Sequence, residues 1–196
     1  MDAQPTFRPA TLADASALAV LVDIAGEGMP NFMWGALAEP AQSAIEVGRE
    51  RARREEGGFS YRHAIIAELH GEIAASLVGY RLDDPYDLPD LDELPDIVRP
   101  LIKLEAQVPG SWYINVLAAF AESRGQGIRT KLLEAAETKG REARAPTMSV
   151  IVGSWNEGAA RLYARVGYAD IAREPANLAP DFPHQGDWVL MKKSLR

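Results

Sequence analysis

The segment from residue 111 to residue 152 constrains the fold more than any other part of the chain. It opens with the strongest strand pattern in the sequence, residues 111–120 (SWYINVLAAF), and continues through a glycine-rich turn. An amphipathic helix over 127–143 and a strand over 147–152 follow. The apolar residues of that helix recur at helical spacing: Ile128, Leu132, Leu133 and Ala136. This strand–helix–strand order predicts an α/β (α+β) domain with a partly parallel sheet.

Shorter patterns predict the remaining elements. Thr11 and Asp14 have capping-box spacing and begin a helix whose apolar stripe runs to Gly26. Two extended runs flank His70-Gly71 and predict an antiparallel hairpin. The other predicted helices cover 40–57, 97–106 and 156–165, and the other predicted strands cover 6–10, 59–69, 72–82, 167–173 and 187–193.

Two segments interrupt this pattern. Residues 26–36 are expected to form an unusually apolar loop that either packs on the core, forms a dimer contact or lines an acceptor site. Its large side chains are Met29, Phe32, Met33 and Trp34. Residues 83–108 form an inserted acidic and helical segment, in which 83–96 hold no basic residue. A solvated loop or a surface that attracts a cationic amine would explain this acidity. No linker or repeat divides the chain, so a single domain over 1–196 is expected.

Composition excludes several classes of function. The absence of cysteine rules out disulfides, thiolate metal sites and cysteine nucleophiles, and fits a cytoplasmic location. A net charge of −7 disfavours nucleic acid as the partner. The three histidines, His63, His70 and His184, lack metal-ligand spacing, so no metal is expected. From the sequence we expect neither a signal segment nor a membrane span, and no membrane partner.

The turn Arg124-Gly125-Gln126-Gly127-Ile128 joins the strongest strand to the amphipathic helix. Glycines let the backbone approach a ligand closely, and a helix amino terminus favours negative charge. Such a junction therefore fits either a phosphate cradle or simply a tight turn. It is not a P-loop, because no Gly-Lys-Ser/Thr follows.

A second motif lies about 30 residues later and favours the cradle. Residues 156–168 read Asn-Glu-Gly-Ala-Ala-Arg-Leu-Tyr-Ala-Arg-Val-Gly-Tyr. Together the two motifs resemble the GNAT superfamily of acetyl-coenzyme A (acetyl-CoA)-dependent N-acyltransferases, with its Arg/Gln-x-x-Gly-x-Gly/Ala and Asn-x-x-Ala-x-x-Leu-Tyr-x-x-x-Gly-Phe/Tyr patterns. Arg129 departs from the first pattern, where the family has glycine or alanine. The resemblance implies a mixed central sheet of about six or seven strands flanked by about four helices.

The resemblance also implies which residues hold acetyl-CoA, the expected cosubstrate. Backbone amides of the turn surround the pyrophosphate: Arg124, Gly125, Gln126, Gly127, Ile128, Arg129 and Thr130. The Arg129 side chain points away or contacts a phosphate. Main-chain groups of Leu117, Ala118 and Ala119 pair with the pantetheine arm like an added strand. Asn156 contacts this arm, caps its helix, or does both. Tyr163 holds the family's general-acid place beside the thioester sulfur, although a core tyrosine is the alternative.

A base must free the amine of a proton before attack, because an ammonium has no lone pair. Tyr113 and Asn115 share one face of the strand 111–120 with Leu117, and are expected to order water. Glu105, just upstream, is the preferred carboxylate, with a solvated surface glutamate as the alternative. His63, on the first hairpin strand, is the second candidate.

The leading interpretation is an N-acetyltransferase that moves an acetyl group directly from acetyl-CoA to a primary amine. A non-catalytic acyl-CoA-binding or sensing module of the same fold is the alternative, and a longer acyl donor is a third. The sequence does not identify the acceptor, which is an amine-bearing small molecule or peptide. Homodimers are common in the family, so dimerisation is an open expectation that a mass measurement in solution decides.

Overall fold

The computed structural model describes residues 4–180 and 182–195. The chain divides into two compact units, the first made of Met1–Tyr80 with Asn115–Ala136 and the second of Arg81–Ile114 with Glu137–Arg196. Strand β4 (Trp112–Ala119) and helix α5 (Ile128–Glu142) each contribute residues to both units. The expectation of a single domain stays a prediction.

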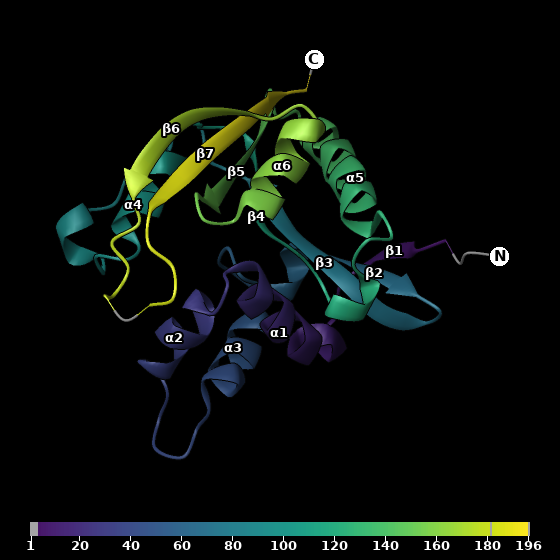
Figure 1. Ribbon diagram of the computed structural model, residues 1–196, viewed down its shortest axis with the longest axis horizontal. Coiled ribbons are helices and arrows are strands. Elements are labelled where there is room, and N and C mark those ends of the chain that lie inside the picture. The colour runs from purple at the N-terminus through teal and green to yellow at the C-terminus, as the bar shows by residue number, and fades with distance from the viewer. Residues whose placement is uncertain (1–3, 181, 196) are drawn as a thin grey trace. The chain divides into compact units, whose positions relative to one another are not determined.

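The first unit combines α-helices with an antiparallel sheet (Figure 1). Its strands are β1 (Thr6–Pro9), β2 (Ala64–Leu69), β3 (Glu72–Arg81) and the later part of β4, hydrogen-bonded in that order. Its helices are α1 (Ala15–Ala25), α2 (Met29–Gly35), α3 (Ala44–Ala52) and the beginning of α5. His70 and Gly71 turn the β2–β3 hairpin at φ 55° and 82°, the left-handed values that a tight hairpin turn requires.

The core of the first unit lies between α1, α2, α3 and the sheet. Leu18 and Ile66 are fully buried there, and Trp34 of α2 stacks on Phe59 with ring centroids 5.8 Å apart. Gly48 of α3 makes room for this indole, since a Cβ at that position would lie 2.3 Å from Trp34. The sequence therefore places its smallest residue where the helix meets the largest side chain of the core.

The prediction of a loop over 26–36 is wrong, because residues Met29–Gly35 form α2. Gly28, at φ 90°, precedes the helix and Pro30 occupies its first turn, where a missing N–H costs nothing. The third helix begins at Ala44, not near Pro40, because Ser43 and Glu46 form a capping box. Short helices bounded by glycine carry little periodic signal, so α2 is the α-helix of the described chain that the sequence patterns did not predict.

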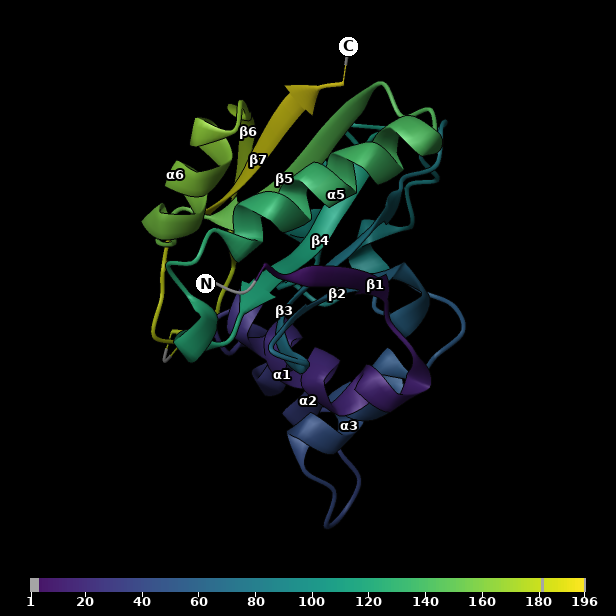
Figure 2. The ribbon, with the colours of Figure 1, turned by 90° about the vertical axis from the view of Figure 1, so that its right-hand side faces the viewer.

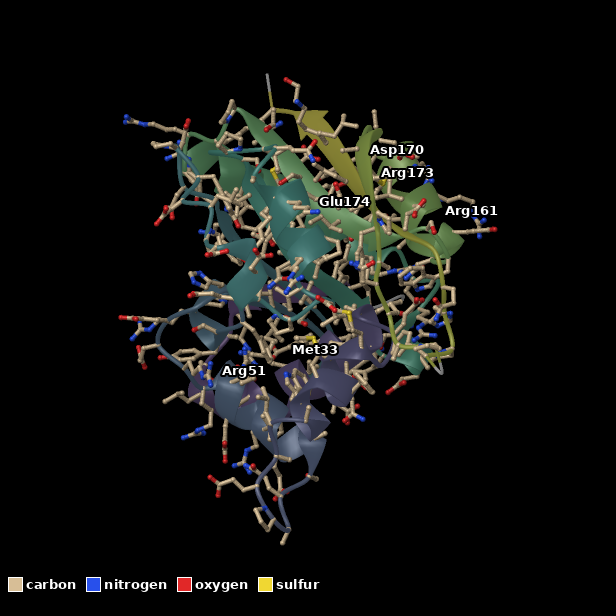
Figure 3. All side chains as sticks on the ribbon, turned by 90° about the vertical axis from the view of Figure 1, so that its left-hand side faces the viewer. Met33, Arg51, Arg161, Asp170, Arg173 and Glu174 are labelled. Carbon is tan, nitrogen blue, oxygen red and sulfur yellow. The ribbon has the colours of Figure 1, made fainter. Side chains whose placement is uncertain are left out.

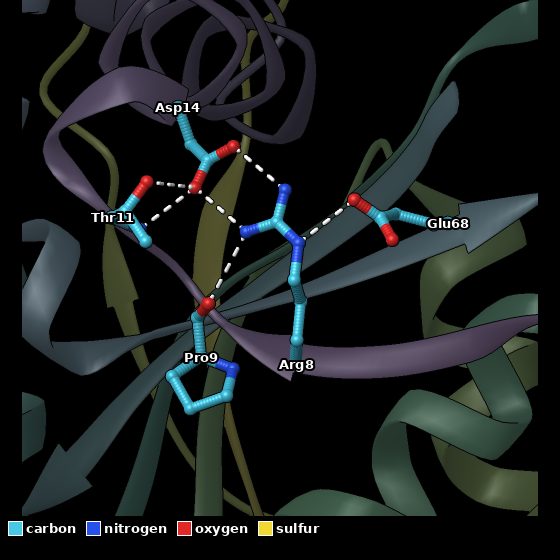
Figure 4. A network of polar contacts seen from close by, with 5 residues as sticks. All are labelled: Arg8, Pro9, Thr11, Asp14 and Glu68. Carbon is cyan, nitrogen blue, oxygen red and sulfur yellow. Dashed lines mark hydrogen bonds and ion pairs between the residues drawn. The ribbon is translucent and has the colours of Figure 1, made fainter. Parts of the chain in front are cut away.

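Ion pairs of Arg8 with Asp14 and Glu68 connect β1 to the residues before α1 and to β2 (Figure 4). The Arg8 guanidinium donates two hydrogen bonds to Asp14, at 2.8 and 2.9 Å, and a third to Glu68 at 2.7 Å. Asp14 Oδ2 also accepts from the Thr11 amide at 2.7 Å, which confirms the predicted capping box. Asp14 is 5% exposed, so its charge depends on these partners.

We expect Asp14→Asn to lower the free energy of unfolding by about 2 kcal/mol at neutral pH. Hydrogen bonding from Arg8 lowers the pKa of Asp14 to about 2. A carboxyl with a depressed folded-state pKa stabilises the fold above its unfolded pKa, near 4, and this contribution disappears as the pH falls toward 2. Urea unfolding of both proteins at about pH 7, 4 and 2.5 measures the difference. If the difference in unfolding free energy between the two proteins stayed the same at about pH 2.5, the ionised Asp14 carboxylate would not be the source of the stability.

The second unit is a sheet in which β7 (Asp187–Ser194) lies between β5 (Thr147–Gly153) and β6 (Ala169–Pro175) (Figure 2). The earlier part of β4 pairs with β5 in parallel, and β7 runs antiparallel to both neighbours. The helices of this unit are α4 (Arg99–Glu105), the end of α5, and α6 (Glu157–Arg165). The mixed α/β fold and the parallel pair predicted from residues 111–152 are confirmed.

Fully buried residues of α4, β5 and β7 contribute to the core of the second unit: Leu104, Met148 and Leu190. The hydroxyl groups of Ser111 and Ser149 meet at 2.7 Å inside it. Over the described residues, no helix has the length and apolar character needed to cross a bilayer.

Candidate functional site

The glycine turn after β4 presents an open backbone to solvent. Gly125 and Gly127 adopt φ 77° and 73°, values that side-chain-bearing residues rarely take, and a Cβ on either would meet no atom within 4 Å. Directly behind them begins α5, whose first amides have no acceptor within the helix. The turn therefore offers backbone donors, a helix amino terminus and free space to an anionic group.

The predicted residues of this turn differ in what they offer. The Arg124 amide donates to Ala121 O at 3.2 Å, and Arg124 Nε donates to Ala119 O at 3.4 Å. Arg124 thus holds the turn, and its amide is already used. Gln126 is exposed, whereas Ile128 is buried at 2% exposure and anchors the first turn of α5. Arg129 and Thr130 follow it in this turn and are partly buried.

The later part of β4 also belongs to the first unit. Ala118 and Ala119 are buried and Leu117 is partly buried, while the Phe120 amide donates to Ala74 O of β3 at 3.0 Å. Asn115 is exposed, and its side-chain amide donates to Gly58 O at 3.4 Å. An exposed amide at this position remains accessible to water.

Asn156 and Tyr163 lie on α6 in the second unit. Asn156 Oδ1 accepts from the Ala159 amide at 3.0 Å, which confirms the predicted helix cap. Tyr163 is 5% exposed and packs edge-to-face against Tyr168, with ring centroids 5.6 Å apart. The Tyr168 hydroxyl is buried with no hydrogen-bond partner among the described residues, and burial raises its pKa.

Glu105 lies at the end of α4 and is not a solvated surface residue. Its carboxylate accepts a hydrogen bond from the Tyr86 hydroxyl at 2.9 Å and another from Tyr113 of β4. Burial raises the pKa of Glu105, and the two hydrogen bonds partly oppose that rise. The structure thus brings together two of the predicted residues, Glu105 and Tyr113, in a setting that makes the carboxylate more basic than an exposed one.

Tyr86 is a residue that the sequence analysis missed. It stands between Pro85 and Asp87 in the acidic segment, where nothing in the local pattern distinguishes it. Burial raises its pKa, as does the nearby Glu105, so its hydroxyl stays protonated and acts as a donor.

His63 lies in a short helical turn, Tyr61–His63, just before β2. The prediction that put it on the hairpin strand is wrong, because Ser60 caps this turn and the strand begins at Ala64. The His63 ring packs against Tyr80 at 5.2 Å, and burial lowers its pKa. His63 belongs to the first unit, whereas Glu105 and its partners Tyr86 and Tyr113 belong to the second.

No cluster of three or more potential metal-ligating carboxylates, histidines or cysteines occurs within residues 4–180 and 182–195. The first unit offers an open turn with backbone donors at the start of α5. The second unit offers a buried tyrosine on α6 and, on α4, a carboxylate with a raised pKa.

Comparison with solved structures shows the same fold. The chain is similar to an N-acetyltransferase of Staphylococcus aureus Mu50, with 20% identity, a TM-score of 0.65 and coverage of 95% of this chain and 99% of that chain. It is similar to yncA of Salmonella typhimurium, solved with its cofactor acetyl-CoA, with 16% identity, a TM-score of 0.62 and coverage of 98% of this chain and 94% of that chain. A ribosomal-protein-alanine N-acetyltransferase of Brucella melitensis matches with 19% identity, a TM-score of 0.61 and coverage of 96% and 99%.

None of the curated proteins matches the chain. A family model, that of the acetyltransferase (GNAT) family, matches residues 31–168, which is more than half of the chain. This range contains both motifs, the glycine turn and α6. The chain therefore belongs to the GNAT family of acetyltransferases and is an acyltransferase enzyme.

Proposed function

We propose that this enzyme transfers an acetyl group from acetyl-CoA directly to a primary amine. The observation that carries the proposal is the glycine turn at the start of α5, where two left-handed glycines leave open space beside the backbone. Such a turn fits a pyrophosphate, because backbone donors and the helix dipole both favour its negative charge.

In this proposal the backbone amides of Gly125–Thr130 hold the pyrophosphate of acetyl-CoA. The Arg129 guanidinium contacts a phosphate oxygen, which gives a role to the residue that departs from the family pattern. Main-chain groups of Leu117, Ala118 and Ala119 pair with the pantetheine arm. The Asn156 side-chain nitrogen contacts the same arm while its oxygen caps α6.

Acetyl-CoA, when bound, supplies the acetyl group as a thioester. Glu105 removes a proton from the ammonium form of the acceptor, and its raised pKa makes it a better base than an exposed carboxylate. The neutral nitrogen then bonds to the acetyl carbon as the carbon–sulfur bond breaks, and Tyr163 donates its phenolic proton to the departing sulfur. The second proton that the nitrogen loses as the amide forms passes through water to the Tyr163 oxygen, and Glu105 returns its proton to solvent. Tyr113 orients Glu105 through its hydrogen bond to the carboxylate, and the exposed side-chain amide of Asn115 orders water for the proton that the amine loses.

A thiol-release assay tests this function. Purified protein with acetyl-CoA is offered a polyamine, an aminoglycoside, a lysine-containing peptide and a peptide with an amino-terminal alanine, and free CoA is measured. At least one amine should increase CoA release well above the rate without amine. Tight binding of acetyl-CoA with no release for any amine would contradict catalysis and favour the acyl-CoA-binding module.

A further inference from the structure

The acidic segment after β3 folds back onto α4 and places one tyrosine against Glu105. The Tyr86 hydroxyl lies 2.9 Å from Glu105 Oε2, and Tyr86 is partly buried. The Tyr113 hydroxyl reaches the same carboxylate from β4. Two donors from separate segments therefore hold one carboxylate, which leaves its remaining lone pairs free to accept a proton.

We propose that Tyr86 is a positioning residue for acetyl transfer, whose hydroxyl fixes the Glu105 carboxylate in the orientation in which it accepts the amine proton. The proposal rests on the proposed function, because it assigns the base of that reaction a fixed partner. It also gives the inserted segment 83–108 a task in catalysis, since both Tyr86 and Glu105 come from it.

The surroundings of Glu105 show why a hydrogen bond from Tyr86 matters. Burial raises the pKa of Glu105, and the hydrogen bonds from Tyr86 and Tyr113 are the two influences that lower it. Helix α4 packs against β6 and β7. An ion pair between Lys103 of α4 and Glu174 of β6, 3.7 Å apart, links the two elements, and Figure 3 labels Glu174. The pKa of Glu105 responds to burial and to the two tyrosines, and not to this ion pair or to the charged residues of β7. Those charged residues are Asp187, Lys192 and Lys193.

Removal of the Tyr86 hydroxyl should change the pKa of Glu105 in a direction that follows from these opposing effects. A hydrogen bond donated to a carboxylate favours its ionised form, so its loss raises the pKa. The Glu105 carboxyl should therefore titrate about one unit higher in Tyr86→Phe. Because the ring stays, the packing of the segment is preserved.

The matched control is Tyr61→Phe. The Tyr61 hydroxyl donates to Glu55 Oε1 at 2.9 Å on an exposed surface of the first unit. This tyrosine–glutamate hydrogen bond has the same length as that between Tyr86 and Glu105. Carboxyl carbon NMR of the full-length protein follows the titration of Glu105, with the signal assigned by its loss in Glu105→Gln. We expect a higher Glu105 pKa in Tyr86→Phe and an unchanged one in Tyr61→Phe.

The pH dependence of kcat/KM gives the functional readout, with the amine that shows turnover. The same acceptor serves every variant, so its own ionisation cancels in the comparison. The kcat/KM of Tyr86→Phe should be about tenfold lower on the acidic side of the profile and unchanged at high pH. Tyr61→Phe should match the unchanged protein throughout. A merely structural role for Tyr86 would lower the whole profile and leave its midpoint in place.

Three outcomes would overturn the proposal. Glu105 titrating identically with and without the Tyr86 hydroxyl would show that this contact does not control the carboxylate. A shifted titration with an unshifted rate profile would show that Glu105 is not the base. No turnover with any amine would refute the proposed function and this role with it, while the NMR titration would still show separately whether Tyr86 holds Glu105.

Discussion

Gly127→Leu should weaken acetyl-CoA binding by at least about 100-fold, or about 2.7 kcal/mol. Gly127 adopts φ 73°, and the space where its Cβ would project is open. A leucine there fills the space through which a pyrophosphate approaches the amides, so charge-assisted hydrogen bonds worth about 1.5–3 kcal/mol each are lost. Isothermal titration calorimetry with acetyl-CoA measures the change.

The matched control for this variant is Gly71→Leu. Gly71, at the tip of the β2–β3 hairpin, has φ 82° and equally open surroundings in the same unit. Both variants carry the same left-handed strain, of about 1–2 kcal/mol, but only one alters the turn before α5. Equal affinity for acetyl-CoA in both variants would contradict the assignment of the turn as the pyrophosphate site.

Tyr163→Phe should lower kcat by about 100-fold or more while leaving the affinity for acetyl-CoA within about twofold. A phenol can donate a proton to a departing thiolate, whereas phenylalanine cannot. The ring itself is retained, so the packing of α6 against Tyr168 is preserved. Steady-state rates with saturating amine, together with calorimetric affinities, separate the two effects.

Tyr168→Phe is the control for that variant. The two rings are 5.6 Å apart, but the Tyr168 hydroxyl is buried without a partner among the described residues. Its removal relieves the cost of a desolvated hydroxyl, so the protein should keep its activity and gain about 1 kcal/mol of stability. If Tyr168→Phe slowed turnover as much as Tyr163→Phe, the effect would lie in packing and the general-acid role would be lost.

The part of the fold that the sequence predicts best is the run from β4 to α6. Each of its elements has a strong local signal: a long apolar strand, a glycine pair, an amphipathic helix and an asparagine cap. Local signals suffice there because the turn and the helix start contain residue types that their backbone conformation favours: glycine at positive φ and asparagine as a helix cap. Gly125 and Gly127 in left-handed conformations and Asn156 on the Ala159 amide show this directly.

The errors fall where long-range packing outweighs local pattern. Helix α2 has seven residues and no repeated apolar period, and it is stable because Trp34 enters the core beside Gly48. Glu105 could be chosen as a candidate from its position before β4. Its tyrosine partner could not, because Tyr86 lies 19 residues away across an irregular segment. The spacing of residues in such a segment does not predict which side chains meet.

Direct acetyl transfer is tested most sharply by one quenched turnover with acetyl-CoA that carries a ¹³C-labelled acetyl group. The protein and an accepted amine are mixed with the labelled acetyl-CoA, and amine and protein masses are measured after quenching. The account predicts the label in an amide of the amine and no acetylated protein. Labelled acetate beside an unmodified amine, or an acetyl group covalently bound to the chain, would contradict it.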